Sequence, residues 1–346
     1  MPRSVVIRKY IAVFIVIAIF RTYLYIIYTT RFGLRLQAKY MWLDFQPAQL
    51  PVFHIYPIRH GNDCMKLIEF QPPPCRTSTL LFLAINSHAK HHSRRNGIRK
   101  SWASNIWLNG NNNETWKTVF IVGLTGDRER DVRVNHEASY HGDMIILNSL
   151  ESHHSLTDKT VTGMHWASKY CQPKFFYKGD DDVWVNKWRI YDYITHLNTS
   201  VPEVYDNHWV GFVSYDNRRP IRNIRSKYYV SHEHYRWGLF PPYCSGFANI
   251  MSGQALRKML DATNYIEKLP GIDDVYIGLL AYKSGIQPIR NLHFRFDSRP
   301  LQRHITKRYV DQTLALHGVT KPDKQLLLND IARRIYIGNQ SIRSLN

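Results

Sequence analysis

The stretch that decides the fold runs from Phe175 to Asn186 and reads FFYKGDDDVWVN. Its aromatic residues are followed closely by Asp180, Asp181 and Asp182. Three adjacent carboxylates repel one another unless a cation or a helix terminus takes up the charge, and a hard divalent cation prefers such oxygen ligands. A solvated acidic turn is the alternative. We favour a ligand site, because a buried strand would deliver the carboxylates to the edge of a sheet, where open α/β folds bind ligands.

The charge of the chain is concentrated at its two ends. The 346 residues carry +19, of which residues 1–40 hold +7 and residues 298–346 hold +6, leaving +6 for the 257 residues between them. This length suits one large α/β domain or two small ones. Nucleic-acid binding would rest on net charge alone, since the middle of the chain is only mildly basic. We predict no nucleic-acid partner.

Residues 10–28 predict a membrane anchor. Nineteen residues, nearly all apolar, approach the roughly 20 that cross a bilayer core. Arg21 lies past the middle, where its side chain can reach the interface. A cleaved signal peptide is the alternative, but no small-residue cleavage site follows, and the unbroken apolar run argues against an amphipathic surface helix. We expect a cytoplasmic tail at residues 1–9 and a single-pass type II signal anchor with the membrane as partner.

The region after the anchor carries features of a secreted protein. Residues 29–75 resemble a stem, because repeated prolines interrupt any regular element. The four cysteines lack metal-type spacing and allow two disulfides in any of three connectivities; they are Cys64, Cys75, Cys171 and Cys244. Three Asn-x-Ser/Thr sequons would accept glycans only in the secretory pathway; they begin at Asn113, Asn198 and Asn339. We therefore expect a lumenal domain.

Short apolar runs recur along residues 76–297. Runs at residues 80–85, 118–122 and 144–147 are typical, like the one at Phe175, of strands buried on both faces. A helix is predicted from Ser155 to about residue 170. Strands and helices that alternate at this spacing predict right-handed βαβ units. The fold class is therefore α/β, with a mostly parallel twisted sheet flanked by helices.

Six segments in this order resemble the metal-dependent β-1,3-glycosyltransferases of glycosyltransferase family 31, which include β-1,3-galactosyltransferases and β-1,3-N-acetylglucosaminyltransferases. The resemblance runs from about Cys75 to about Asp297, some two-thirds of the chain. It implies a GT-A type fold, a UDP-sugar donor and inversion at the anomeric carbon. The matching segments are Arg95–Trp102, Phe120–Gly123, Glu137–Asp143, Lys178–Asn186, Phe240–Gly246 and Asp273–Gly278.

The resemblance and the chemistry of the carboxylates assign a metal and donor site. A Mn²⁺ or Mg²⁺ ion that bridges carboxylate and diphosphate oxygens would neutralise the charge of the leaving group. We predict Asp182 as the direct metal ligand, with Asp180 beside it and His293 as a second protein ligand. Asp180 and Asp181 would also contact the ribose and metal-bound water. Lys178 would offset the charge of the carboxylates.

The resemblance also places a catalytic base and a nucleotide site. Inverting transfer needs one base opposite the leaving group. Asp274 occupies the family position for this base and Asp273 is the alternative, although both acids would also complement a helix dipole. Arg95 and Arg99 are four residues apart and share one face of a predicted helix. A surface basic patch is the alternative, and we expect both to face the donor nucleotide.

Two segments depart from the family pattern. Residues 151–155 read ESHHS, where the family commonly has Asp, Tyr and Asn. Residues 248–250 read Ala-Asn-Ile in place of Gly-Tyr-Val, in the expected acceptor region. The second departure bears on acceptor choice, and it leaves open a glycan-binding protein that has the fold without turnover.

We predict a Golgi enzyme that transfers a hexose or N-acetylhexosamine to the 3-hydroxyl of a glycan. UDP-galactose is the favoured donor, and the N-acetylglucosamine and N-acetylgalactosamine donors remain alternatives. The acceptor glycan would belong to a glycoprotein, glycolipid or proteoglycan. Residues 298–346 match no family segment and are expected to form a basic extension packed on the catalytic domain of residues 76–297. A homo-oligomer stays open.

Overall fold

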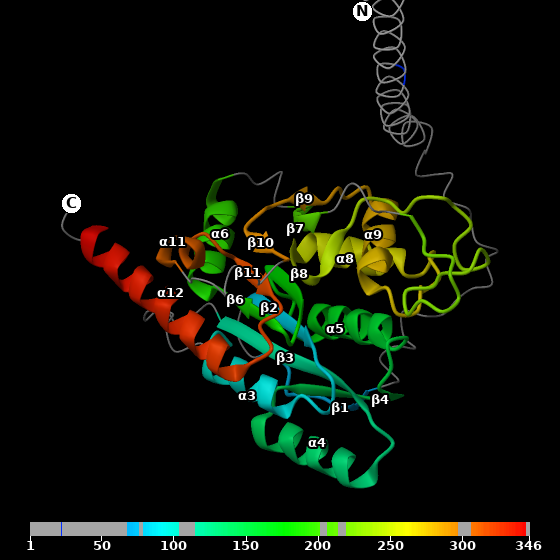
Figure 1. Ribbon diagram of the computed structural model, residues 1–346, viewed down its shortest axis with the longest axis horizontal. Helices are drawn as coiled ribbons and strands as arrows, with labels where there is room; N and C mark the ends of the chain where they lie inside the picture. The colour runs from blue at the N-terminus through cyan, green and yellow to red at the C-terminus, as the bar shows by residue number, and fades with distance from the viewer. Residues whose placement is uncertain are drawn as a thin grey trace, which may run out of the picture. The chain divides into compact units, whose positions relative to one another are not determined.

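The computed structural model describes residues 68–75, 79–103, 115–200, 206–213, 219–296 and 306–343, together with Thr22 (Figure 1). The chain divides into two compact units, Met1–Val52 and Phe53–Asn346. All elements named below belong to the second unit. The predicted tail, anchor and most of the stem lie outside the described residues, Thr22 excepted. Among the residues that are described, no helix has the length and apolarity needed to cross a bilayer.

An eight-stranded mixed sheet lies at the centre of this unit, in the order β1-β4-β3-β2-β5-β8-β7-β9. Only β1 and β8 run antiparallel to their neighbours in it, so six of its eight strands point the same way. This confirms the predicted α/β class and its mostly parallel sheet. The strands are β1 (Ile68–Phe70), β2 (Thr79–Asn86), β3 (Thr115–Leu124), β4 (Met144–Leu150), β5 (Phe175–Asp180), β7 (Trp209–Val213), β8 (Cys244–Ser252) and β9 (Ile289–Arg290).

Helices cover both faces of the sheet (Figure 1). All eight residues of β2 are buried, as its unbroken apolar run predicts. On one face the strands share a core with α3 (His92–Lys100) and α4 (Arg128–His141). On the other face, α5 (Leu156–Tyr170) places Trp166 against Phe82, with ring centroids 5.6 Å apart. The remaining helices are α6 (Lys187–Ser200), α8 (Gly253–Ala262), α9 (Asp273–Lys283), α11 (Lys307–Asp311) and α12 (Pro322–Arg343).

A second sheet of three strands adjoins the aspartate triplet. It consists of β6 (Val183–Val185), β10 (Phe294–Arg295) and β11 (Ala315–His317), in the order β10-β11-β6. β11 runs antiparallel to β6 and pairs His317 with Val183. The C-terminal segment, which matches no family segment in sequence, therefore supplies the strand that passes beside Asp182.

The last helix is held to this region by one buried glutamine. Trp102 donates from Nε1 to Oε1 of Gln325 at 2.9 Å. Gln325 in turn donates from Nε2 to the carbonyl oxygens of Val183 at 3.1 Å and Val319 at 2.9 Å. Since Gln325 is only 1% exposed, α12 joins α3 and β6 through a polar contact that water cannot replace.

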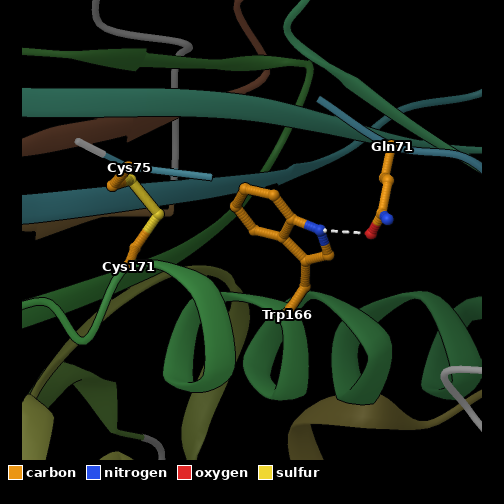
Figure 2. The surroundings of a disulfide bond; sticks show 4 residues. All are labelled: Gln71, Cys75, Trp166 and Cys171. Atoms are coloured by element: carbon orange, nitrogen blue, oxygen red, sulfur yellow. Dashed lines mark hydrogen bonds between the residues drawn. A yellow bond between two sulfur atoms is a disulfide. The ribbon is translucent and has the colours of Figure 1, made fainter. Parts of the chain in front are cut away.

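One disulfide joins Cys75, after β1, to Cys171 at the end of α5 (Figure 2). Beside it, Trp166 donates from Nε1 to Oε1 of Gln71 at 3.0 Å. Cys244 is a buried free thiol, so the predicted second disulfide does not include it in this structure. Cys64 lies outside the described residues.

We predict that replacing Gln325 by Leu lowers the free energy of unfolding by about 2 kcal/mol, because an indole N–H and two carbonyl oxygens lose their buried partner. Urea denaturation of Gln325→Leu measures this loss. The exposed neighbour Lys324 provides the control, and Lys324→Ala should change stability by no more than about 0.5 kcal/mol. Equal stability of the two variants would contradict the role of Gln325.

Candidate active site

The carboxyl ends of β2 and β5 meet the first turn of α9. Asn86 ends β2 and pairs in register with Asp180 at the end of β5. The amide of Asn86 donates to Thr160 Oγ1 at 2.7 Å and to Asp273 Oδ2 at 3.5 Å. The topology thus brings together two acidic segments that are nearly a hundred residues apart in the chain.

The ammonium of Lys178 lies between two carboxylates. Its Nζ is 3.1 Å from Asp180 Oδ1 and 2.9 Å from Asp273 Oδ2, and it also donates to the carbonyl of Gly246. The side chain is 1% exposed. Burial opposes the charge, yet Asp180 and Asp273 raise the pKa of Lys178 above its ordinary value. As predicted, Lys178 lies where it offsets the charge of the carboxylates.

Asp180 remains short of positive charge despite this contact. Burial raises its pKa to about 7, and the neighbouring carboxylates of Asp273 and Asp182 act in the same direction against the opposing effect of Lys178. A carboxyl group in this condition is stabilised in its ionised form by any further cation nearby. Asp180 therefore has the electrostatic surroundings of a group that shares a cation.

Asp181 serves a different purpose. Its Oδ2 accepts from Ser87 Oγ and lies against His91 Nδ1, both at 2.7 Å, while its Oδ1 accepts from Arg94 at 2.8 Å. Burial alone would raise its pKa, but the contacts with His91, Ser87 and Arg94 lower it. The carboxylate, 6% exposed, attaches the start of α3 to the sheet. We therefore no longer expect it to contact ribose.

Asp182 faces a histidine that sequence analysis missed. Its Oδ1 is buried without a hydrogen-bond partner and lies 3.7 Å from Nε2 of His317. Nδ1 of His317 is 3.3 Å from the carbonyl of Phe296, which can only accept, so Nδ1 donates there and Nε2 is left facing Asp182. The ring also stacks on Phe296, with centroids 5.1 Å apart. Such outer contacts orient a metal-binding histidine.

These donors fit a divalent cation. A shared ion would give a partner both to the buried carboxylate oxygen of Asp182 and to the imidazole nitrogen of His317 that faces it. Among the described residues, no group of three or more His, Cys, Asp or Glu side chains could hold a metal. Asp182 and His317 would supply only part of a coordination sphere, and catalytic Mg²⁺ sites commonly complete theirs with phosphate oxygens and water.

His293, the predicted second ligand, lies elsewhere. It is exposed and lines a cavity of about 830 Å³ together with Arg189 of α6 and Asp311 of α11. The correction has a simple cause. β11 runs alongside β6 toward the triplet, whereas the turn that carries His293 precedes β10, and strand pairing cannot be read from a short polar turn. The sequence does contain a signal for His317, because a short strand-like run ends on this histidine, just as β5 ends on an aspartate.

The two acids of α9 are in unlike surroundings. Asp273, 3% exposed, accepts from Thr160 Oγ1 at 2.6 Å as well as from Lys178. Asp274 is partly exposed, and its Oδ1 accepts from the N–H of Val275 at 2.8 Å. Burial, followed by the charge of Asp273, raises the pKa of Asp274 to about 6. Of the two, Asp274 is the one that a hydroxyl group could reach.

Gly246 allows this arrangement to be compact. A Cβ at this position would lie 3.3 Å from both Asp273 Oδ1 and the Cβ of Asp274.

The departure from the family pattern at residues 248–250 lies inside β8, where Ala248, Asn249 and Ile250 are 0% exposed. These three residues form part of the sheet core. The departure is therefore no argument for an altered acceptor surface or a loss of turnover.

Arg95 and Arg99 form a buried ionic network. All five N–H donors of Arg95 are engaged, two by Glu137 at 2.8 and 2.6 Å and three by Ser87 and the carbonyls of His88 and Ala89. Arg99 binds both oxygens of Asp143 at 2.8 Å and also Glu137. With Arg95 at 0% exposed, neither the predicted nucleotide contact nor its surface alternative describes this residue.

A second buried pair joins the ends of three strands. Glu151 accepts from the N–H groups of Ala89 at 3.2 Å and Gly123 at 2.9 Å, and it pairs with Lys159 of α5. Lys159 also donates to the carbonyl of Ser87 at 3.0 Å. The segment that departs from the family pattern at residues 151–155 thus begins with a residue that shapes this edge of the sheet.

Comparison with known proteins agrees with this site. Residues 93–292 match the family model described as galactosyltransferase. Because the match covers more than half of the 346 residues, the chain belongs to the galactosyltransferase family. The segment holds the aspartate triplet, the Gly246 loop and both acids of α9.

Several curated proteins are similar to the chain. Human lactosylceramide 1,3-N-acetyl-beta-D-glucosaminyltransferase is 31% identical over 62% of this chain and 57% of that protein. Human N-acetyllactosaminide beta-1,3-N-acetylglucosaminyltransferase 2 is 33% identical over 75% of this chain and 64% of that protein. Beta-1,3-galactosyltransferase 5 of Pan paniscus is 30% identical over 63% of this chain and 70% of that protein. The chain thus spans less than two thirds of the length of the first two.

Among solved structures, mouse xyloside xylosyltransferase 1 in its apo form is similar with a TM-score of 0.33 and 12% identity, over 69% of this chain and 97% of that one. A likeness of this size supports no conclusion about fold or chemistry. The family assignment rests on the sequence match.

We predict that Glu137→Gln lowers the free energy of unfolding by about 3 kcal/mol, because Arg95 would stay buried without its counter-charge. Burial alone would raise the pKa of Glu137, but the contacts with Arg95, His92 and Arg99 lower it from 4.5 to about 2. The stability that this pair contributes is therefore complete above pH 4.5 and decreases as the pH falls toward 2.

Urea denaturation over a series of pH values measures the difference between wild type and Glu137→Gln. Glu129→Gln is the matched control, since Glu129 is 87% exposed and 3.8 Å from its partner Arg133. A difference that did not shrink on acidification would contradict the assigned pair.

Proposed function

We propose that this protein is an inverting β-1,3-glycosyltransferase of GT-A type that uses a UDP-sugar donor. The observation that carries the proposal is the meeting of Asp180 and Asp273 at the buried Lys178, which brings their chain neighbours Asp182 and Asp274 to the same edge of the sheet. One part of this cluster offers carboxylates to a cation, and another offers an accessible carboxylate to a hydroxyl group. The family match and the printed activities of the relatives support the same class of reaction.

Asp182 and His317 would hold the cation, Mn²⁺ or Mg²⁺, with Asp180 near it. When bound, such an ion supplies Lewis-acid stabilisation of the diphosphate leaving group. Asp180 and Lys178 would set the charge beside the donor. Lys178 would also attach Asp273 to β5, so that α9 begins at a constant position.

Asp274 would remove the proton from the acceptor hydroxyl as that oxygen attacks the anomeric carbon. Its pKa of about 6 suits a general base that works near neutral pH. Asp273, the earlier alternative, is 3% exposed, and its Oδ2 accepts from Thr160 and pairs with Lys178. It would act as a positioning residue.

The donor sugar is galactose or an N-acetylhexosamine, since the relatives carry both kinds in their names. The acceptor would be a glycan on a glycolipid, glycoprotein or proteoglycan. We further propose a Golgi enzyme anchored through residues 10–28, consistent with the apolar sequence there. UDP release across a panel of UDP-sugars, measured with Mn²⁺ and a glycan acceptor, tests the reaction class. No release with any donor would overturn the proposal.

We predict that Asp274→Asn lowers kcat by on the order of 10³, because the base is lost while the donor site remains. Affinity for UDP with Mn²⁺ should stay within about twofold, as isothermal titration calorimetry would show. The exposed Asp261 of α8 provides the matched control, Asp261→Asn. Loss of UDP binding by Asp274→Asn would place the base at another residue.

The two histidines give a sharp test of the metal assignment. His317→Ala should weaken Mn²⁺ binding in the presence of UDP by about tenfold or more, and Asp182→Ala should do the same. His293→Ala is the matched control and should leave Mn²⁺ affinity unchanged. Titration calorimetry with Mn²⁺ measures all three variants. A loss confined to His293→Ala would restore the assignment made from sequence.

A further inference from the structure

The basic loop, residues 219–240, is a compact feature whose function the catalytic cluster does not explain. It appears in yellow-green near α5 and α9 in Figure 1. Apart from an isolated bridge between Ile221 and Tyr229, it has no strand pairing. The loop leads directly into the segment Phe240–Gly246, and a Cβ placed on Gly246 would lie 3.3 Å from atoms of both acids of α9.

Arg222 holds the basic loop in one conformation. Its guanidinium donates to the carbonyl oxygens of Val230 at 2.8 Å, Ser231 at 2.7 Å, Tyr235 at 2.6 Å and Trp237 at 3.1 Å. Four acceptors from the same loop replace the ladder hydrogen bonds that it lacks. A charged donor makes strong hydrogen bonds, so these contacts fix the backbone of the loop. The exposed side chains of the loop are therefore held on a pre-organised backbone.

The exposed side chains of the loop, called its outer face below, are largely cationic and aromatic. Glu233 is the single acid in residues 219–240. None of the exposed cations has a carboxylate partner within the described part of the chain; these cations are Arg219, Arg225, Lys227 and Arg236. Lys227 lies 4.7 Å above the ring of Tyr228, and the guanidinium of Arg236 lies 4.1 Å above the ring of Trp237. Tyr228 and Tyr229 are 45% and 38% exposed.

His153 connects this face to the start of α9. Its ring meets that of Tyr228 edge to face, with centroids 5.2 Å apart. Its Nδ1 would lie 2.6 Å from a Cβ placed on Gly271, two residues before Asp273. His153 therefore lies between Tyr228 of the basic loop and the turn from which α9 begins.

We propose that the outer face of the basic loop binds an anionic group, a carboxylate or a sulfate, on the acceptor oligosaccharide. This inference rests on the proposed function, since it assigns the acceptor that would present its hydroxyl to Asp274. Unpaired cations would bind the anion through charge-assisted hydrogen bonds. The exposed tyrosine rings would lie against the apolar faces of neighbouring sugar rings.

A neutral acceptor would gain little from four unpaired cations. An anionic membrane would match the charge and the exposed Ile224, which is 77% exposed. The surface, however, is linked through His153 to the turn that precedes α9, the helix that carries Asp274. A lipid surface there would compete with the acceptor for the same space, so an acidic glycan fits both the charge and the position.

The test compares the full chain with its Arg225→Ala/Lys227→Ala variant. Binding of three hexasaccharides is measured by titration calorimetry at low and high salt, one sulfated, one with uronate groups and one neutral. The acidic probes should bind wild type more tightly than the neutral probe, and the variant should lose on the order of tenfold in affinity for them. High salt should reduce this difference.

Arg333→Ala/Arg334→Ala on α12 removes the same charge from a different surface and should keep the acidic affinity of wild type; thermal melting checks that both variants fold. Which acidic probe binds more tightly identifies the anion, and either result supports the proposal. The proposal would be overturned if both variants lost the same affinity for the acidic probes, or if wild type did not prefer them. It would also be overturned if wild type bound anionic vesicles more tightly and the loop variant abolished that binding. UDP release with a neutral acceptor is assayed separately, so failure of the proposed transfer is distinguished from failure of the acidic subsite.

Discussion

The buried ammonium of Lys178 is the interaction on which the site depends. It contacts Asp180 at the end of β5, Asp273 at the start of α9 and the carbonyl of Gly246 in β8. These three segments come from separate parts of the chain, and two of them carry carboxylates that would otherwise repel each other. A single cation with 1% exposure makes their approach favourable, because the attraction is strong where water is excluded.

The acidic residues have different roles, and their burial and hydrogen bonding decide which role each one has. Asp181 and Glu137 have both oxygens occupied by protein donors, and Oδ2 of Asp273 accepts from Thr160 and Lys178, so these three carboxylates hold elements together. Asp182 retains an oxygen without a partner, and Asp274 stays partly open to solvent. Carboxylates with satisfied oxygens stabilise the fold, whereas those that remain unsatisfied or accessible are left for ligands. The same sequence motif therefore contains both kinds.

Sequence analysis predicted the elements around Phe175–Asp180 well, because a continuous apolar run followed by acids has a local signature. It also placed Lys178 as the offsetting charge. It could not distinguish Arg95 from a ligand-binding arginine, since its partner Glu137 lies on another helix. It did not single out His317, which faces Asp182, because the pairing of β11 with β6 is a contact distant in sequence.

The amino-acid sequence by itself determined the α/β class, the family and the acidic segments of the candidate site. Periodicity and motif spacing are local properties, and these conclusions depend on nothing else. The tertiary structure alone decided which carboxylates are engaged, which histidine faces Asp182, and that the basic loop adjoins α9. Those outcomes depend on burial and on contacts between distant segments, and both exist only after the chain has folded.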